Sequence, residues 1–400
     1  MCAEHASIDL DGPAEADPPA GDVRRNYTLG VLSGAVGTMS FQFMHPELIL
    51  AGMIYALTES TMLVALVTVV SKACILAPQL LVGHRLEHHA LKRPFFIGLG
   101  IVKFFAVAGM VLAISRLSPG STGWPLVLFY LTYAIACTCA GAGYVVFMDM
   151  AGRMIPSGKV GSFFGMRHFL GGVLAPVLAL VVIHPVLTKV TLPFNYVIVV
   201  ATGAVLAVVN LALFAMCRES PGPKARTPTT LGESLRRGMG WLRSDRNYRN
   251  YFWQRVAFRV NYLGLAFYIP FGHRTLARGR SAAEVALLGG IMVGTMILGS
   301  TVASALWGRV ADRHGYRRCM MGAGVLFTLG PALALAAPRL QAVTTAVDLP
   351  LTVYLLALLA MASGIQGSVI GGTQFMVTTA PPHRRISYVA FQNTITSPLT

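Results

Sequence analysis

A few ionisable residues in this chain have the types and spacing that chemistry requires. Arg255 and Arg259 lie one helical turn apart on one face of any helix that contains them, and Asn261 follows closely. Together with Lys72 and Arg167 they outnumber the acids at membrane depth, which favours an anionic or zwitterionic ligand. Asp149 and Arg167 have the signs of an ion pair, and a buried acid in such a pair is a candidate for taking up and releasing a proton.

One histidine cluster has the spacing of a metal site. His84 and His88 are one helical turn apart, with Glu87 beside them, as in some zinc sites. These positions coincide with basic positions of a repeated loop, described below, so we expect no metal there. The sequence has no P-loop, no Ser/His/Asp arrangement and no paired carboxylates. We therefore expect no enzymatic activity and no cofactor.

The composition is that of a membrane protein. Hydrophobic residues make up 54% of the chain and charged residues only 12%, and the mean hydropathy is +0.62. Soluble domains carry about 25% charged residues, because polar side chains must cover their surface. The composition therefore predicts an all-α integral membrane protein in contact with the lipid bilayer.

Apolar runs of about 20 residues, the length needed to cross the hydrocarbon core, recur along the chain. Ten are complete, and an eleventh begins near Ser387 and is cut off at Thr400. The predicted spans are 27–46, 61–82, 95–115, 124–148, 162–186, 194–217, 252–272, 285–307, 319–338 and 350–378.

The positive charge of the chain predicts its orientation. Most of the 32 Lys and Arg residues fall in loops on one side of these spans. By the positive-inside rule this side is cytoplasmic, which places the N-terminus and the central linker there. We expect a multi-pass protein of the cytoplasmic (inner) membrane, and a monomer. Because the charge lies in short loops, nucleic acid is not an expected partner.

The chain is also internally repeated. Gly308 to Arg318 reads G-R-V-A-D-R-H-G-Y-R-R, and Gly83 to Arg93 reads G-H-R-L-E-H-H-A-L-K-R with glycine, an acid and two basic residues in register. Two further pairs of segments repeat at nearly the same offset. The predicted domains are a disordered tail (1–23), an N-terminal six-helix bundle (24–217), a basic linker (218–250) and a C-terminal bundle (251–400). By this symmetry the C-terminal bundle is incomplete, so we expect the sequence to be a fragment.

Within the linker, the segment from Leu231 to Leu242 has two interpretations. Leu231, Leu235, Met239 and Leu242 have helical spacing, which predicts a short helix on the membrane surface. A loosely ordered basic linker is the alternative.

The second loop resembles the signature G-x-x-x-D-R-x-G-x-R-R of the major facilitator superfamily of transporters. The matching residues are Gly308, Asp312, Arg313, Gly315, Arg317 and Arg318. The first loop is a degenerate copy that keeps Gly83, Glu87, Lys92 and Arg93. The resemblance covers nearly all of residues 24–400 and implies two pseudo-symmetric six-helix bundles around a central cavity, with alternating access by rocking of the two halves.

The two loops are expected to act as gates. A glycine lets helix backbones approach closely, and an acid is stabilised at the positive N-terminus of a helix. Asp312 is therefore expected to face the start of the fifth span near Ser162, and Glu87 the start of the eleventh near Ser387. Such contacts would hold the cytoplasmic side closed.

The resemblance also selects candidates for the solute site, because the first, fourth, seventh and tenth helices line the cavity in this family. The candidates on these helices are Gln42, Tyr133, Tyr144, Arg259, Asn261, Gln366 and Gln374. Lys72 and Lys103 add positive charge at membrane depth, and Lys103 is expected toward the edge of its bundle.

The expected function is secondary active transport of a small solute, preferably anionic or zwitterionic, coupled to a proton gradient. Two alternatives remain open at this point. One is a sensor or assembly subunit that has the fold but does not transport, and the other is a lipid flippase of the same fold. The identity of the solute depends on which side chains converge in the cavity.

Overall fold

The computed structural model of the chain describes residues 19–86, 89–118, 123–222, 231–276, 281–343, 348–380 and 385–396. All regular elements in these ranges are helical. The N-terminal part contains α1 (Ala20–Phe43), η1 (Pro46–Leu50), α2 (Ala51–Thr58), α3 (Thr61–Leu86), α4 (Arg93–Ser115), α5 (Trp124–Met154), η2 (Ser157–Lys159), α6 (Val160–Leu178), η3 (Ala179–Ile183), α7 (His184–Lys189) and α8 (Phe194–Ala215). The C-terminal part contains α9 (Leu231–Ser244), α10 (Arg246–Leu276), α11 (Ala282–Val343), α12 (Asp348–Thr379) and α13 (Arg385–Thr396).

Seven helical stretches in the described residues are long and apolar enough to cross a membrane. They are Thr61–Gln79, Arg93–Ser115, Trp124–Met154, Ser157–Lys189, Phe194–Ala215, Ala282–Leu340 and Leu349–Thr379. The predicted spans 27–46 and 252–272 fall mainly within α1 and α10, which are helical but less apolar.

The long helix α11 consists of two predicted spans joined by a sharp bend. The bend lies at Gly315, where φ is 79° and ψ is 161°. This φ lies in the left-handed region, which glycine adopts without a steric penalty. The second glycine of the signature is therefore the residue at which the chain turns back. Both halves of α11 pack against α12.

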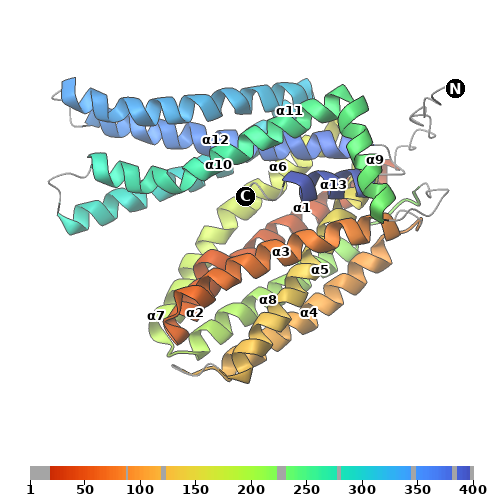
Figure 1. Cartoon of the computed structure of the whole chain (residues 1–400), viewed down its shortest axis with the longest axis horizontal. Helices are drawn as coiled ribbons and strands as arrows, with labels where there is room; N and C mark the ends of the chain where they lie inside the picture. The colour runs from red at the N-terminus through yellow and green to blue at the C-terminus, as the bar shows by residue number, and fades with distance from the viewer. Residues whose placement is uncertain are drawn as a thin grey trace.

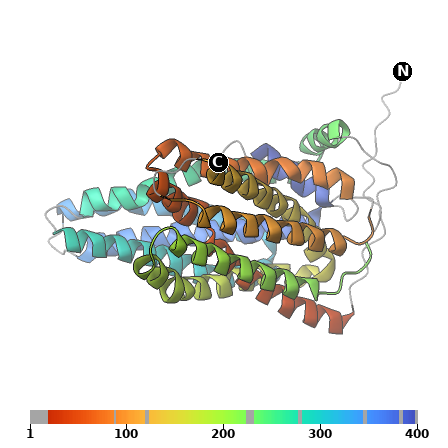
Figure 2. The same ribbon diagram turned by 90° about the horizontal axis from the view of Figure 1, so that it is seen from below.

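The helices form two arms that converge at one end of the molecule (Figure 1). The upper arm in this view contains α10, α11 and α12, and the lower arm contains α3, α4, α5 and α8. We count α6 with the N-terminal arm and α13 with the C-terminal arm, because these are the parts of the chain to which they belong. The arms meet near α9, at what we call the α9 end, and they diverge toward the opposite end. There the C-terminal helices project beyond the N-terminal ones, as Figure 2 also shows.

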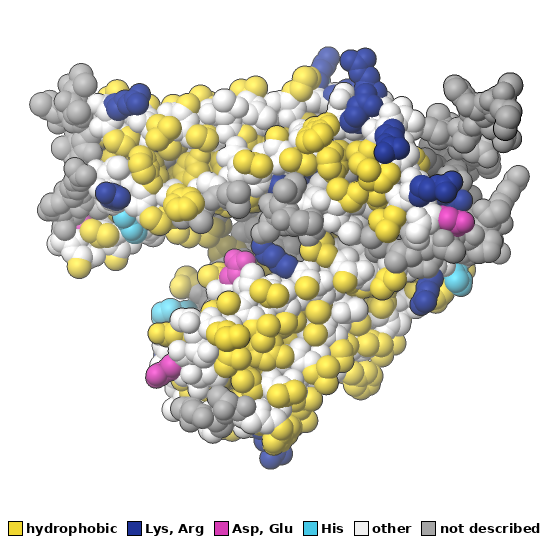
Figure 3. All heavy atoms as spheres, in the orientation of Figure 1, with side chains coloured by type: hydrophobic (Ala, Val, Ile, Leu, Met, Phe, Trp, Pro, Cys, Tyr) yellow, Lys and Arg dark blue, Asp and Glu magenta, His cyan; other side chains and the backbone are white. Residues whose placement is uncertain are grey.

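The surface is hollowed between the two arms (Figure 3). Hydrophobic side chains cover much of both arms on this face, as expected of helices that contact lipid. Many of the visible Lys and Arg side chains lie toward the α9 end.

The largest hydrophobic cluster joins the two arms. It combines Val145 and Phe163 of the N-terminal part with Phe375, Tyr388 and Phe391 of the C-terminal part, and each of these side chains is at most 2% exposed. Two other clusters each draw on one part only. The arms are therefore packed together over an apolar seam near the α9 end.

The linker segment forms a helix, α9, as one of the two interpretations predicted. Trp241 is buried against the rings of Tyr388 and Phe391, with centroid distances of 5.2 and 6.4 Å. Leu235 and Met239 of the predicted apolar stripe are exposed. The sequence pattern thus predicted the helix, but Leu242 of the predicted stripe packs against the largest hydrophobic cluster. The pattern also missed Trp241, which attaches the helix to the bundle.

Candidate functional site

The carboxylate of Asp312 connects the two parts of the molecule. It accepts hydrogen bonds from the backbone N–H groups of Gly161 at 2.7 Å and Ser162 at 2.8 Å. These donors belong to the first turn of α6, where N–H groups lack helical partners and the helix dipole favours a negative charge. The predicted contact between Asp312 and the start of the fifth span is therefore present.

Close approach of the two backbones makes this contact possible. A Cβ atom on Gly308 would lie 2.8 Å from the carbonyl oxygen of Gly161, and one on Gly165 would lie 2.5 Å from the carbonyl oxygen of Ser304. No side chain fits at such distances, so glycines are required on both helices. We call the contact of Asp312, Gly308, Gly161, Ser162 and Gly165 the α6–α11 latch.

The other residues of the second loop lie on the surface. Arg313, Arg317 and Arg318 are exposed, and Arg317 donates a hydrogen bond of 3.0 Å to the Asn247 side chain. They contribute positive charge at the α9 end rather than contacts between the arms.

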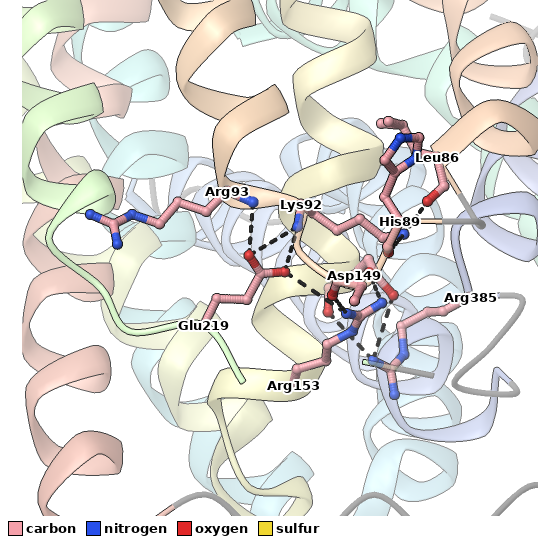
Figure 4. Close-up of polar contacts among 9 residues, drawn as sticks. Leu86, His89, Lys92, Arg93, Asp149, Arg153, Glu219 and Arg385 are labelled. Carbon is pink, nitrogen blue, oxygen red and sulfur yellow. Dashed lines mark hydrogen bonds and ion pairs between the residues drawn. The ribbon is translucent and has the colours of Figure 1, made fainter. Parts of the chain in front are cut away.

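The first loop is only partly described, because Glu87 lies outside the described residues. Gly83 is in the last part of α3, and Lys92 and Arg93 begin α4. The Glu219 carboxylate accepts hydrogen bonds from the backbone N–H of Lys92 at 2.8 and 3.0 Å and from that of Arg93 at 2.7 Å (Figure 4). An acid that the sequence analysis did not single out thus caps the start of α4.

A buried ion cluster lies next to this cap (Figure 4). Asp149 forms an ion pair with Arg153 of its own helix at 2.5 Å and contacts Arg385 of α13 at 3.9 Å. Arg153 also lies 3.8 Å from Glu219. Asp149, Arg153 and Arg385 are 1%, 6% and 4% exposed, so two acids and two arginines balance their charges away from solvent.

The predicted pairing of Asp149 with Arg167 is wrong. The guanidinium of Arg167 donates a hydrogen bond to the carbonyl of Gly30 in α1, and it lies over the rings of Phe147 and Phe163 at 4.5 and 5.3 Å. Its partners are thus a carbonyl and two aromatic faces. Asp149 pairs instead with Arg153, one turn along its own helix, and contacts Arg385 of the C-terminal part.

A second set of polar residues lies on α5, α10 and α12. Arg255 and Arg259 are one helical turn apart on α10, and Tyr144 of α5 is 43% exposed. Arg255 also donates a hydrogen bond of 3.2 Å to Ser368 of α12. The structure thus joins α10 and α12, two of the helices that the resemblance assigns to the central cavity.

The remaining solute-site candidates are more dispersed. The Asn261 amide donates to the carbonyl of Phe327 at 3.2 Å, and Gln374 donates to that of Ala311 at 3.0 Å, so both connect helices within the C-terminal part. Gln366 has a buried side-chain oxygen without a hydrogen-bond partner. Gln42 is half-buried in the last turn of α1. Tyr133 is buried inside the N-terminal part.

Sequence reasoning missed the roles of Arg153, Glu219, Arg385 and Lys103. The spacing of Asp149 and Arg153, one helical turn apart, was a usable signal for an ion pair. Lys103 was expected at the edge of its bundle, but it lines a cavity inside that bundle. Among the described residues, no three His, Cys, Asp or Glu side chains are grouped as metal ligands.

Comparisons with known proteins agree with the architecture. The family model described as "Sugar (and other) transporter" matches residues 264–393. No curated protein sequence is significantly similar to this chain.

Three solved structures have a similar fold at low sequence identity. A bacterial homologue of the iron transporter ferroportin, in an outward-facing state, is 15% identical with a TM-score of 0.69 over 94% of this chain and 89% of that one. The proton:xylose symporter XylE is 12% identical, with a TM-score of 0.64 over 95% and 87% of the two chains. The human organic anion transporter MFSD10 is 14% identical, with a TM-score of 0.59 over 96% and 98%. Together with the apolar helices, these matches identify the chain as a multi-pass membrane protein with the fold of the major facilitator superfamily of transporters.

Proposed function

We propose that this protein is a secondary active transporter that moves a small solute across the cytoplasmic membrane by alternating access. The observation that carries the proposal is the α6–α11 latch, in which Asp312 binds the first turn of α6 across the two arms. The apolar seam and the ion cluster lie at the same end of the molecule. A closed end and a divergent end are the geometry of one state of a rocking transporter.

The direction of opening follows from charge. Arg313, Arg317 and Arg318 and the basic residues of α9 lie at the closed end, and the positive-inside rule places such an end in the cytoplasm. The conformation is then outward-facing. The similarity to a ferroportin homologue in an outward-facing state supports the assignment of this conformation.

The solute class follows from the residues between the arms. Arg255 and Arg259 lie one helical turn apart on α10, a helix without an acidic residue. This arrangement favours an anionic or zwitterionic solute, because guanidinium groups bind carboxylates and phosphates in a fork geometry.

Proton coupling is proposed through Asp149. Its carboxylate lies between Arg153 and Arg385, on the two arms. Protonation of Asp149 would remove the negative charge that holds the two arginines together, and their repulsion would then favour separation of the arms at this end. A proton taken up there would thus be linked to opening of the cytoplasmic side.

The test is substrate counterflow in proteoliposomes, with a panel of labelled organic anions, zwitterions and neutral sugars. The proposal predicts counterflow of at least one anion or zwitterion, its acceleration by an imposed proton gradient, and its loss in Arg259→Ala. Arg249→Ala, at the exposed start of the same helix, is the matched control and is expected to retain activity. Correctly folded protein that gives no counterflow with any compound would contradict the proposal.

A further inference from the structure

The N-terminal part contains a partly open cavity, and neither arginine of the pair on α10 lines it. Its volume is about 330 Å³, within the range of small-molecule sites. Four helices, α1, α4, α5 and α8, provide most of its wall, and α3 and α6 complete it. Tyr144, one of the solute-site candidates, also lines this cavity.

The cavity is elongated and mostly apolar. Along α4 it extends from Phe96 to Met110, which corresponds to about 21 Å of helix. Leu99 and Val107 of α4 and Leu211 of α8 are among its apolar lining residues. A wall of this kind fits a narrow hydrocarbon or aromatic body rather than a sugar, which needs hydrogen bonds around its ring.

Lys103 places a positive charge in the middle of this wall. It lines the cavity about halfway along α4, and the thiol-bearing residues Cys137 and Cys139 of α5 line the same cavity. No acidic residue is among the described residues that line the cavity. Lys103 has no ion-pair partner within the described part of the chain. An ammonium group at membrane depth is costly unless an opposite charge meets it.

A second polar group lies in the same region. Tyr133 lines the cavity and is 5% exposed, and its hydroxyl lies beside Ser71 and the Cys137 thiol without a well-aligned hydrogen bond to either. Tyr133 and Cys137 are one turn apart on the same face of α5, so the hydroxyl lies beside the thiol, and both residues line the cavity with Lys103. Arg167 is the other basic residue that lines the cavity. Its guanidinium donates a hydrogen bond to the carbonyl of Gly30 and lies over two aromatic rings.

We propose that this cavity is a binding site for an organic monoanion with an elongated apolar body, such as an alkyl carboxylate. The carboxylate pairs with Lys103 and accepts a hydrogen bond from the Tyr133 hydroxyl, while the apolar body lies along α4 and α8. The site selects against cations and gives no charge compensation to a neutral compound of the same length. This inference concerns binding and holds whether or not the bound molecule is transported.

The test is equilibrium binding of radiolabelled dodecanoate to the full chain in nanodiscs of neutral phosphatidylcholine. Saturable binding is expected for the wild-type protein, with competition by unlabelled dodecanoate but not by dodecyltrimethylammonium or dodecanol. Lys103→Met is expected to weaken binding at least tenfold, whereas Lys103→Arg keeps the charge and retains binding within about threefold. Lys72→Met removes another lysine at membrane depth that does not line the cavity, and it serves as the control.

A stability measurement separates a binding role from a structural one. Without ligand, Lys103→Met removes an uncompensated charge and is expected to melt at or above the wild-type temperature, whereas loss of a structural lysine would lower it. Absence of saturable dodecanoate binding, or undiminished binding to Lys103→Met, would overturn the inference. Because the assay measures no flux, its failure leaves the transport proposal to be judged by counterflow.

Discussion

Asp312 of α11 and Gly161 of α6 form a hydrogen bond of 2.7 Å between the two arms, from a backbone N–H to a carboxylate oxygen. The bond is charge-assisted, and a second one to Ser162 holds the other carboxylate oxygen. Since both donors belong to a helix N-terminus, separation of the arms would leave an acid and two N–H groups without these partners. The latch therefore favours the conformation seen here without preventing its opening.

Removal of the charge at position 312 should shift the balance between the two states. Hydrogen bonds to charged groups contribute about 1.5–3 kcal/mol each, so Asp312→Asn is expected to increase the open population at the α9 end about tenfold or more. Cysteine introduced at Ala390, which is 0% exposed in the seam, reports this change by its rate of alkylation from the cytoplasmic side.

Asp245→Asn is the matched control for that measurement. Asp245 also accepts hydrogen bonds from backbone N–H groups at a helix start, those of Asn247 and Tyr248, but it does not connect the arms through them. In the Asp245→Asn variant, the cysteine at position 390 should be alkylated at a rate near that of the wild type. Equal rates for Asp312→Asn and the wild type would show that the latch does not control closure.

The close contact at the glycines predicts that a larger side chain there also shifts the balance toward the state that is open at the α9 end. Gly165→Val places atoms against the backbone of Ser304, where a Cβ would already be 2.5 Å from the carbonyl oxygen, so the arms should fail to close. We expect rapid alkylation of the cysteine at position 390 and loss of solute counterflow. Gly324→Ala, on an open face of α11, should behave as the wild type. A fully active Gly165→Val protein would contradict the close approach.

The ion cluster predicts non-additive effects on stability. Breaking a buried pair typically costs about 3–5 kcal/mol, because one charge is left uncompensated. Asp149→Asn and Arg385→Met should each lower the melting temperature in nanodiscs, and the double variant should be more stable than the sum of the two losses predicts. Asp149→Asn combined with Arg317→Met, on the exposed loop, should be additive. Additive losses for Asp149 and Arg385 would exclude a direct interaction.

The sequence was informative where local chemistry determines the contact. The position of Asp312 followed from an acid in a recognisable loop and from the general affinity of helix N-termini for negative charge. Gly315 was identified as part of the same signature, and its positive φ explains why that position is glycine. The helical character of the spans followed from their length and apolar composition.

The partners of Asp149 were harder to predict, because Arg385 approaches it from a distant part of the chain. Helix rotation decides such contacts, and composition alone does not reveal it. The same uncertainty affected Lys103, since an apolar helix with one lysine has no strong amphipathic face. Arg167 follows Asp149 on the next span, yet a carbonyl and two aromatic rings are its partners in the fold.

The most direct test of alternating access is to lock the latch covalently. Cysteines at positions 162 and 312 replace two neighbouring residues, since the backbone N–H of Ser162 lies 2.8 Å from the carboxylate of Asp312. A disulfide between these cysteines would hold the α9 end closed. The account predicts that oxidation abolishes counterflow in proteoliposomes and that reduction restores it, while the single variant Ser162→Cys is unaffected by the oxidant. Full counterflow with the disulfide in place would contradict it.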